Sequence, residues 1–547
     1  MSVEIDQKYA VIVIGAGTSG CIVAARLSED PARRVLLLEA GPDFAEGKPE
    51  ALRDARAAVV QGYHWPFNAS VHTTNAASLG QEMKRAAGVF AAASGRLNMM
   101  RATMGGLLAG GNPVSRFPYP MARVLGGGSS VNGAMAMVPP AQDFDGWAGL
   151  GNPDWTWDQV APWFARLLGT DGGAPIVPIE PTRSDTFTPI QRAFHAACVE
   201  LGHADVDLGD PDAIGVGGVP CNVLDGVRMS TDELYLRTAL ARDNLELRAG
   251  VMVERILLED GEDGEDGAPR ACGVEALIGG ERLRIRAQRI VLCAGAINSP
   301  ALLQRSGIGP RDALEAAGVP VRLHAPGVGA NLIDHPALCL WAVPRAGACS
   351  PREPFHQVVL RAGGDALQVL MLGATRTELF PPLREVSGSE IAIGLSAVLG
   401  RPRSRGRVRI ASPDPGSSPA IELNLLAHPE DMAQAMAGAR LVWRIAGRPS
   451  LRDRIERVVM WNDAIVADDR QLETLVYTTV RSSMHPVGTV RMGGDDDPMA
   501  ATDGFGALRG VGSLTVADAS IMPAITTVPT NLACMAIAER IAFRLRK

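Results

Sequence analysis

The residues whose types and spacing first suggest chemistry are three glycines and one acid near the N-terminus. After an apolar run the chain reads Gly15-Ala16-Gly17-Thr18-Ser19-Gly20, and Glu39 follows 19 residues beyond Gly20. In such a loop Gly15 permits a tight turn, Gly17 lets backbone approach a pyrophosphate, and Gly20 lets a helix pack closely on a strand. The diphosphate would contact the free N–H groups at the start of that helix, and Glu39 would accept hydrogen bonds from ribose hydroxyls.

The elements around this loop have the order that a dinucleotide site needs. An apolar strand is expected over residues 9–14, an amphipathic helix over 21–27, and a second apolar strand ending near Gly41. The alternative is a glycine-rich structural turn, but strand, helix, second strand and acid all stand at the right spacing. The acid would repel a 2′-phosphate, which disfavours NADP. The fingerprint alone does not separate FAD from NAD.

The bulk composition limits the class of protein. The chain has 547 residues, 46% hydrophobic and 21% charged, which predicts a globular protein of two or more lobes. A net charge of −7 gives no reason to expect nucleic acid or an anionic membrane as partner. The eight cysteines have no zinc-like spacing, so no metal site is expected, and they favour a reducing compartment. No secretory signal or apolar span is found, so a cytoplasmic location is the expectation.

Three further segments have interpretable patterns. Residues 80–115 are rich in Ala, Gly and Met, interrupted by arginines, which favours a packed helix or a mobile lid over a membrane segment. The acidic stretch 259–269 separates two β-like runs and is interpreted as a hairpin loop. The alternating arginines of residues 401–410 favour the exposed face of a strand over a nucleic-acid patch.

Several later motifs carry a resemblance to a known family. They are RVLGGGSSVNG at 123–133, GAINSPALLQRSGIG at 295–309, GVGANLIDHP at 327–336, HPVGTVRMG at 485–493, VADASIM at 516–522, and the closing PTNLACMAIAER. Together with the N-terminal fingerprint, and in this order, they resemble the glucose–methanol–choline (GMC) family of flavoprotein oxidoreductases. The likeness runs from about Tyr9 to Arg540, and within the family it looks closest to bacterial primary- and aromatic-alcohol oxidases and dehydrogenases.

The resemblance implies an α/β (α+β overall) fold with a Rossmann-like FAD-binding domain and a second, substrate-binding domain built on a mainly antiparallel sheet with helices. Both domains would be discontinuous. The FAD-binding domain would comprise residues 1–154, 223–337 and 476–547, and the substrate-binding domain residues 155–222 and 338–475.

The resemblance also implies positions for the cofactor. The segment from Gly126 to Asn132 should pass along the flavin, with Asn132 and Gly133 near the ring. Val253 should meet the adenine, and Asp518 should lie near the ribityl chain and pyrophosphate. The complete set adds to the N-terminal residues Gly126, Gly127, Gly128, Ser129, Asn132, Gly133, Ala134, Met135, Val253, Asp518, Ala519, Asn531 and Leu532. Each has a structural alternative: the triple glycine could be a flexible turn, and Asp518 could cap the helix that follows it.

His485 and Asn531 match the family's catalytic histidine and its His-or-Asn partner. An alcohol loses hydride more readily as its alkoxide, and a histidine can take the hydroxyl proton near neutral pH. Asn531 cannot titrate, but its amide can donate to the developing alkoxide. The alternatives are a structural histidine before a proline and an asparagine that caps the C-terminal helix. His335, in the DHP motif, is the competing histidine and is assigned to packing or a domain hinge.

The sequence departs from the family pattern in two places. Gly128 stands where a first serine is common, and Met137-Val138-Pro139-Pro140 stands where Tyr-x-Arg-Gly is frequent, so substrate contacts cannot be transferred. Met484 and Met135 either line the pocket or serve packing. No His or Cys lies between Arg116 and Asp145, which predicts non-covalent FAD.

The expected function is oxidation of an alcohol to an aldehyde or ketone by hydride transfer to flavin N5, with His485 as general base. The electron acceptor is O₂, a quinone or another carrier, and the sequence specifies neither it nor the substrate or oligomeric state. The alternative is a redox-neutral lyase, since hydroxynitrile lyases use this scaffold. A photochemical decarboxylase and a flavin-binding protein without turnover are further alternatives.

Overall fold

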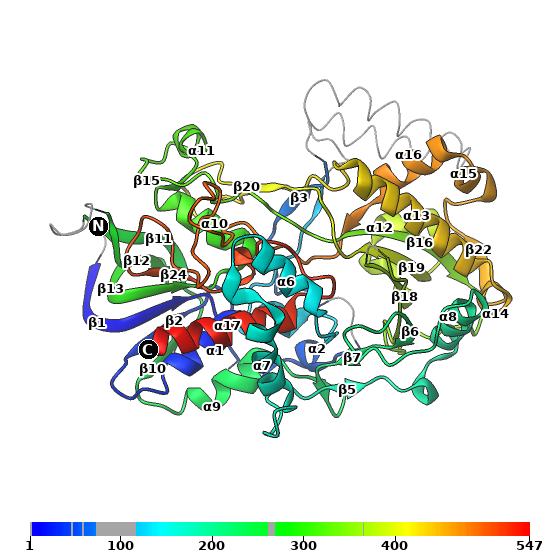
Figure 1. Cartoon of the computed structure of the whole chain (residues 1–547), viewed down its shortest axis with the longest axis horizontal. Coiled ribbons are helices and arrows are strands. Elements are labelled where there is room, and N and C mark those ends of the chain that lie inside the picture. Colours follow the sequence, from blue (N-terminus) through cyan, green and yellow to red (C-terminus); the bar gives the residue numbers. More distant parts are fainter. Residues whose placement is uncertain (1–2, 45–46, 57–59, 73–115, 261–267, 365) are drawn as a thin grey trace.

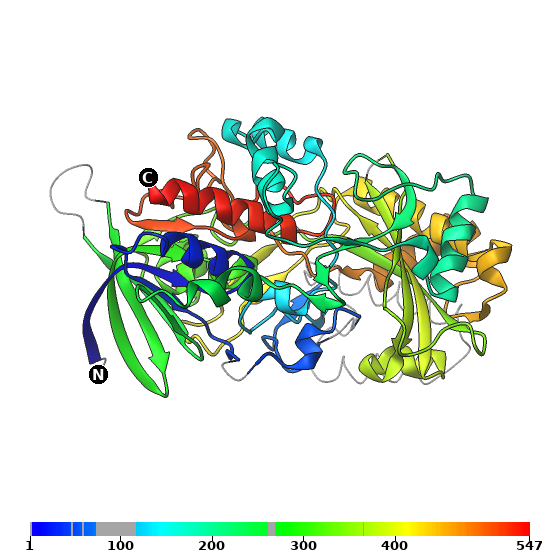
Figure 2. The same cartoon turned by 90° about the horizontal axis from the view of Figure 1, so that it is seen from below.

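The computed structural model describes residues 3–44, 47–56, 60–72, 116–260, 268–364 and 366–547. Two sheets occupy opposite halves of the molecule, and helices pack on each (Figures 1 and 2). The first is mainly parallel and the second antiparallel. The predicted fold class is confirmed. The segment 80–115, for which a packed helix or lid is expected, lies outside the described residues.

The first sheet contains the predicted strand–helix–strand unit. Its strands are ordered β10-β2-β1-β13-β12-β11, with β24 also paired to β13. Strands β10, β2, β1, β13 and β24 are mutually parallel, and β11 and β12 are antiparallel additions. The strands are β1 (Val3–Ile14), β2 (Val35–Leu38), β10 (Leu245–Arg248), β11 (Met252–Glu259), β12 (Arg270–Ile278), β13 (Glu281–Leu292) and β24 (Leu514–Val516).

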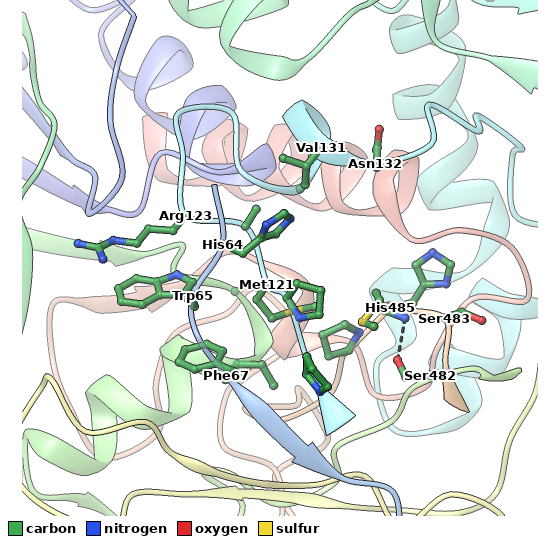
Figure 3. Close-up of a pocket in the computed structure, with 18 of the residues that line it drawn as sticks. His64, Trp65, Phe67, Met121, Arg123, Val131, Asn132, Ser482, Ser483 and His485 are labelled. Atoms are coloured by element: carbon green, nitrogen blue, oxygen red, sulfur yellow. Dashed lines mark hydrogen bonds between the residues drawn. The ribbon is translucent and has the colours of Figure 1, made fainter. Parts of the chain in front are cut away.

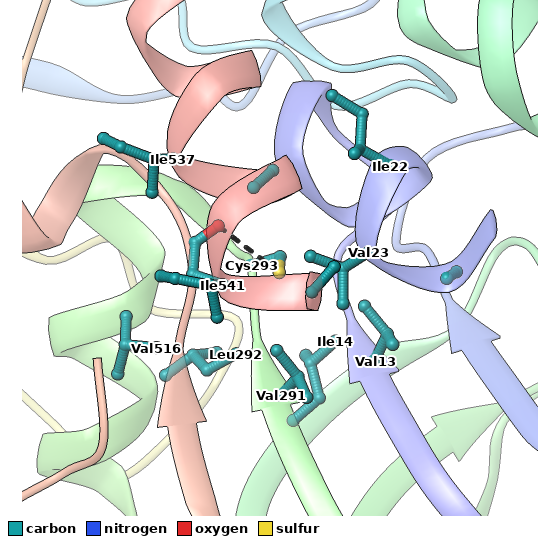
Figure 4. Close-up of a cluster of buried hydrophobic side chains, with 14 of the residues drawn as sticks. Val13, Ile14, Ile22, Val23, Val291, Leu292, Cys293, Val516, Ile537 and Ile541 are labelled. Atoms are coloured by element: carbon teal, nitrogen blue, oxygen red, sulfur yellow. Dashed lines mark hydrogen bonds between the residues drawn. The ribbon is translucent and has the colours of Figure 1, made fainter. Parts of the chain in front are cut away.

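Burial explains why the central strands are apolar without alternation. All four residues of β2 and residues 11–14 of β1 are buried, because helices cover the sheet. Helices α1 (Thr18–Leu27) and α17 (Asn531–Arg546) pack on one another over these strands. Figure 4 shows Val13, Val23, Val291, Val516 and Ile537 meeting in this core. Thus α1 begins directly after β1, at a parallel sheet's carboxyl edge, where such folds bind ligands.

The predicted hairpin is confirmed at its two strands. Glu259, the last residue of β11, pairs with Arg270, the first residue of β12. Residues 261–267, which connect them, lie outside the described residues.

The second sheet has the order β22-β16-β19-β18-β17-β6, with β23 also paired to β16. All its pairs are antiparallel. Helices α8 (Pro189–Glu200) and α13 (Pro429–Ala446) pack against it, and α16 (Asp469–Thr479) packs on α13. The strands are β6 (Gly215–Gly218), β16 (Pro336–Pro344), β17 (Val358–Arg361), β18 (Leu367–Arg376), β19 (Ile391–Leu399), β22 (Ile455–Val458) and β23 (Arg481–Ser482).

Between the two halves lies a small sheet of β20 (Arg407–Arg409), β21 (Ala420–Glu422), β3 (Asn68–Ser70) and β4 (Arg116–Pro118). The remaining helices of three or more residues that the argument uses are α5 (Gly128–Val131), α6 (Ala141–Gly149), α7 (Trp157–Leu168), α10 (Gly295–Arg305), α12 (Pro381–Ser387) and the 3₁₀ helix η5 (Ala519–Ile521). No helix in the described ranges has the length and apolarity that a membrane crossing requires.

The arrangement of the cores refines the expected domain boundaries. Helix α7 follows residue 155, where the substrate-binding domain was expected to begin, yet Val160, Phe164 and Leu167 belong to the core of the first sheet. Helix α8 instead belongs to the core of the second. We therefore propose that the first substrate-binding segment begins after α7. The expected third FAD-binding segment, 476–547, begins inside α16 and includes β23, a strand of the second sheet.

Candidate active site

A single cavity of about 1860 Å³ runs from the start of α1 to the second sheet. It brings together most of the residues singled out in the sequence. Those that line it are Gly15, Gly17, Thr18, Ser19, Glu39, Gly127, Gly128, Asn132, Gly133, Met135, Val253, His485, Asp518, Ala519 and Asn531. Met484 lines it as well, so both methionines considered for the pocket are there. Gly20, Gly126, Ser129, Ala134 and Leu532 are not among its lining residues.

The fingerprint glycines have distinct local environments. Gly15 has φ +93°, and a Cβ on Gly20 would lie 1.8 Å from the Gly15 carbonyl oxygen, so α1 packs on β1 only because Gly20 has no side chain. A Cβ on Gly17 would meet only the Gly127 Cα, at 3.8 Å. Among the described residues no side chain caps α1 at Gly17. The N–H groups of its first turn are therefore available to a ligand in the cavity.

Glu39 is held in place at the end of β2 by backbone donors. Its carboxylate accepts hydrogen bonds from the N–H groups of Ala16, at 2.8 Å, and Gly41, at 2.7 Å. Burial raises the pKa of this carboxyl group, while these N–H donors act in the opposite direction. A carboxylate has about four lone-pair sites, so two hydroxyl groups could still donate to it.

The glycines of residues 126–128 form a second tight turn against the first. Gly126 and Gly127 have φ +82° and +53°, and a Cβ on Gly127 would lie 2.6 Å from the Gly17 Cα. Ser129 is buried and its hydroxyl donates to the Gly126 carbonyl at 2.6 Å. Gly126 and Ser129 therefore shape the turn from behind, and Gly127 and Gly128 line the cavity. Two of the three glycines therefore adopt backbone conformations that L side chains rarely adopt.

After this turn the chain passes along the cavity, and one residue there, Ala134, has a strained backbone conformation. The Asn132 side-chain oxygen accepts from the Ala134 N–H at 3.0 Å, and Ala134 has φ +56°. Left-handed backbone at a non-glycine residue is costly and persists where the surroundings impose it. The Gly133 carbonyl accepts from Nε2 of His356 at 3.0 Å, and a Cβ on Gly133 would lie 2.6 Å from that imidazole. His356 was not singled out from the sequence.

Asp518 caps the segment that follows it and also lines the cavity. Its carboxylate accepts from Ser520 N–H at 2.8 Å and so caps η5, the segment that follows it. It also accepts from Gly295 N–H at 2.8 Å, at the start of α10, and from the Ser299 hydroxyl at 2.6 Å. Because Asp518 also lines the cavity, the cap and a ligand contact are compatible. Burial raises the pKa of this carboxyl group.

These residues fit FAD. The open N–H groups of α1, the side-chain-free approach at Gly17 and the carboxylate of Glu39 suit a diphosphate followed by a ribose. The same cavity is lined by residues from the start of α1 through Asn132 to His485, which suits an elongated dinucleotide. Within the described residues no cluster of three or more His, Cys, Asp or Glu side chains is arranged to hold a metal ion.

His485 lies on a strained turn between the two halves. Met484, just before it, has φ +63°. The His485 N–H donates to Asp334 at 2.9 Å, and the Met484 N–H donates to the Ser482 hydroxyl at 2.7 Å. Figure 3 shows His485 and Ser482 together at the cavity wall, with Asn132 and Val131 on a different segment of the wall. The turn thus fixes where the imidazole stands.

Asp334 anchors this turn from within the protein. It is buried, and besides the His485 N–H it accepts from the Tyr119 hydroxyl at 2.5 Å and from the Ser482 hydroxyl. Three donors, from two distant segments of the chain, therefore converge on one carboxylate. Buried polar groups need such partners, so loss of Asp334 would leave all three unsatisfied.

The imidazole of His485 contacts that of His335. Their Nδ1 atoms lie 3.0 Å apart, and the Nε2 atom of His335 lies 2.9 Å from the Thr526 carbonyl oxygen. A carbonyl can only accept, so Nε2 of His335 carries a proton. When both rings are neutral, Nδ1 of His335 must then accept, and Nδ1 of His485 must donate. This leaves Nε2 of His485 with a free lone pair, the form that a proton acceptor needs.

Both imidazoles are held in the neutral form. Burial lowers the pKa of His485 to about 4. Burial, and next the neighbouring His485, lower the pKa of His335 to about 3. Because a histidine can take up a proton only while it is neutral, a lowered pKa keeps His485 able to accept one over a wide pH range.

Asn531 is the first residue of α17, not its cap. The residue before it, Thr530, occupies the cap position. The Asn531 side-chain oxygen accepts from the Thr18 hydroxyl at 3.2 Å. This contact joins the first turns of α1 and α17 and orients the amide. Its NH₂ group donates to the sulfur of Met535 at 4.0 Å and has a second hydrogen that could be donated to a ligand.

The residues that sequence reasoning missed are the partners of His485. His335 was assigned to packing or a hinge, yet its ring contacts the His485 ring; Asp334, Tyr119 and Ser482 were not considered. The DHP motif did contain two of them, but the two histidines are 150 residues apart in the chain. The pairing of β16 with β23 and the bridge between Ile333 and Val487 bring them together.

Comparisons with known proteins agree with this site and fold. A family model described as GMC oxidoreductase matches residues 9–337, and a second matches residues 402–538. An oxygen-dependent choline dehydrogenase of Vibrio vulnificus is 31% identical, over 98% of this chain and 94% of that protein. A 5-(hydroxymethyl)furfural oxidase of Methylovorus sp. is also 31% identical, over 98% of each.

Among solved structures, pyridoxine 4-oxidase from Mesorbium loti superposes with a TM-score of 0.81 and 28% identity, over 98% of this chain and 99% of that one. The family models cover most of the chain, and the similarity extends over nearly its whole length. The chain therefore belongs to the GMC oxidoreductase family, and it is an enzyme of the FAD-dependent kind that acts on CH–OH groups.

Proposed function

We propose that this protein oxidises an alcohol to an aldehyde or ketone, with His485 as the general base and Asn531 as a donor to the substrate oxygen. The observation that supports this most directly is the hydrogen-bond chain from the Thr526 carbonyl through His335 to His485. It leaves the Nε2 lone pair of His485 unused at a residue that lines the cavity. The relatives named above support the class of substrate, since their names state alcohols.

The residues of the chain perform the proton chemistry. Nε2 of His485 accepts the hydroxyl proton of the substrate, and the amide of Asn531 donates to the oxygen as negative charge develops on it. The new imidazolium keeps its Nδ1–H bond to His335, so protonation requires no change of partner. FAD, when bound, supplies the acceptor for the hydride from the carbinol carbon. The reduced cofactor would be reoxidised by O₂, or by a quinone or another carrier.

We propose that FAD is held without a covalent bond. The residues that would hold it are those of α1, β2, the 126–135 segment, β11 and η5 that line the cavity. The thiols that line the cavity, Cys293, Cys339 and Cys534, are weak nucleophiles, because burial raises the pKa of each. Unfolding the holoenzyme in denaturant should release the flavin into the filtrate; flavin retained on the chain would contradict the proposal.

The experiment that tests the function follows the flavin absorbance when alcohols are added without oxygen. We expect primary, secondary or benzylic alcohols to bleach the flavin band of the wild type. The substitution His485→Ala should slow bleaching by about 10²- to 10⁴-fold, the usual contribution of a general base. The control is His324→Ala, because His324 is an exposed histidine outside the cavity.

Three outcomes would decide against the proposal. Product formed from cyanohydrins without any bleaching would favour the lyase alternative. Bleaching unaffected by His485→Ala would remove His485 as the base. A purified protein that binds flavin but reacts with no alcohol would favour a function without alcohol oxidation.

A further inference from the structure

The face of the second sheet that lines the cavity differs from the face that packs into the core. Along β16, Leu338, Leu340 and Ala342 are buried in the core of the second half. The residues that alternate with them along the strand, Ala337, Cys339 and Trp341, are less buried and line the cavity. Because side chains alternate along a strand, one face of the sheet is a wall of the substrate side of the cavity. Leu372 of β18 and Ser396 of β19 also line it.

Arg481 stands on this same face. It belongs to β23, where it pairs directly with Ala337 of β16, and directly paired residues on antiparallel strands point to the same side of the sheet. Arg481 is exposed and lines the cavity. The other residues of this wall named above are all uncharged, so Arg481 places one positive charge on an otherwise neutral surface.

The guanidinium of Arg481 is anchored at one nitrogen only. Its Nη1 donates to the carbonyl oxygens of Val480, at 2.7 Å, and Thr478, at 3.2 Å. Among the described residues none accepts a hydrogen bond from its Nε or Nη2, and no carboxylate forms an ion pair with it. Glu385 of α12 also lines the cavity, but it makes no ion pair with Arg481. Nε and Nη2 form one edge of the guanidinium plane, which matches the two oxygens of a carboxylate.

The guanidinium of Arg481 is accessible from the cavity and has no ion-pair partner among the described residues. The protein around the guanidinium lowers the pKa of Arg481, because it removes part of its hydration. A ligand with a negative charge and two acceptor oxygens would stabilise such a guanidinium. The anchored Nη1 also fixes the orientation of the free edge, so a ligand would not have to order it.

Arg481 and His485 are close enough in the chain to bind opposite ends of one substrate. They are only four positions apart in the chain, so their Cα atoms are at most about 14 Å apart even in extended chain. Both side chains line the same cavity. A small aromatic or aliphatic alcohol could therefore place its carbinol at His485 and a second polar group at Arg481.

We propose that Arg481 binds a carboxylate group of the substrate and that the preferred substrates are alcohols that carry such a group at a distance from the carbinol. The inference rests on the proposed function. The inference adds the chemical class of the substrate to that function. Arg481 would select this class and would take no part in the proton transfer.

The test uses a matched pair of substrates, 4-(hydroxymethyl)benzoate and its uncharged amide, 4-(hydroxymethyl)benzamide. We measure kcat/KM for flavin reduction in the holoenzyme and take the ratio of carboxylate to amide. The wild type should prefer the carboxylate by about 10- to 100-fold, the range for a hydrogen-bonded charge pair. Arg481→Met should reduce this ratio towards one, mainly through KM. Arg481→Lys keeps the charge without the planar edge and should retain part of the ratio.

The control is Arg470→Met, which removes the same charge from α16 at an exposed position that does not line the cavity. It should keep the wild-type ratio, which excludes a general electrostatic effect. A wild-type ratio near one, or a ratio unchanged in Arg481→Met and Arg481→Lys, overturns the inference while bleaching by both alcohols leaves the proposed function standing. Failure of both alcohols to bleach a flavin-loaded wild type would instead count against the proposed function, and the inference would fall with it.

Discussion

The half of the cavity formed by the parallel sheet presents mainly backbone, whereas the half formed by the antiparallel sheet presents side chains. On the first side, the turns of residues 15–20 and 126–128 meet so closely that a Cβ on Gly127 would lie 2.6 Å from the Gly17 Cα. On the second side, residues of alternating strands and the turn at His485 form the wall. Backbone and glycine suit a ligand that is the same in every member of a family, and side chains suit a substrate that differs between members.

The largest expected effect, on stability and on flavin binding, is at Gly17 and Gly20 at the start of α1, and it would test this contrast. Gly20→Ala places a methyl group 1.8 Å from a backbone carbonyl, so we expect a lower unfolding temperature and loss of bound flavin. Gly17→Ala meets nothing closer than 3.8 Å, so the apoprotein should keep its unfolding temperature while flavin binding weakens. Thermal unfolding with and without FAD, together with flavin content, measures both.

The matched control is Gly146→Ala on α6, where the added Cβ has no neighbour within 4 Å. It should retain flavin, with stability unchanged or slightly raised, since alanine favours helix. Full flavin content in Gly17→Ala would contradict the view that this glycine faces the cofactor.

A smaller effect is expected from two neighbours on β16. Leu340 is fully buried, so Leu340→Ala should lower the free energy of unfolding by about 2–5 kcal/mol and leave KM close to that of the wild type. Trp341 points to the cavity, so Trp341→Ala should cost less stability and change KM and the range of alcohols accepted. Denaturant unfolding and steady-state kinetics separate the two. If Trp341→Ala lost as much stability as Leu340→Ala and kept the wild-type KM, the assignment of this face to the substrate would be contradicted.

The smallest effect is expected from pH in the range where most histidines titrate. Because the pKa of His485 is lowered to about 4, flavin reduction should stay constant from pH 8 to about pH 5 and decline only towards pH 4. In the unfolded chain the same group titrates near pH 6.5. The unfolded state therefore binds the proton first, and the free energy of unfolding should fall as the pH falls from about 6.5 to about 4.

Stopped-flow flavin reduction and denaturant unfolding at several pH values measure these two profiles. His485→Gln removes the titrating ring and should weaken the pH dependence of stability. A reduction rate that halves near pH 6.5 would show that His485 is protonated like a free imidazole, and the neutral hydrogen-bond chain through His335 would then be wrong.

The sequence by itself determined the cofactor side of the protein. The glycines, the strand–helix–strand order and Glu39 lie within some forty residues, and their spacing reflects local backbone geometry that a linear pattern can express. Along the chain, the order of the six later motifs sufficed for the family and for the two-domain fold. Even at Asp518, however, the pattern could not show that one carboxylate both caps η5 and faces the cavity.

Only the tertiary structure decided the surroundings of His485 and the character of the cavity wall that the second sheet forms. His335 and His485 are 150 residues apart, and their contact depends on the pairing of a two-residue strand that no periodicity predicts. Likewise, whether Arg481 points to the cavity or to the core depends on the register of β23 against β16, because a shift of one residue reverses the face. Local spacing can specify a turn, but the tautomer of an imidazole and the partner of a charge depend on atoms contributed by distant segments.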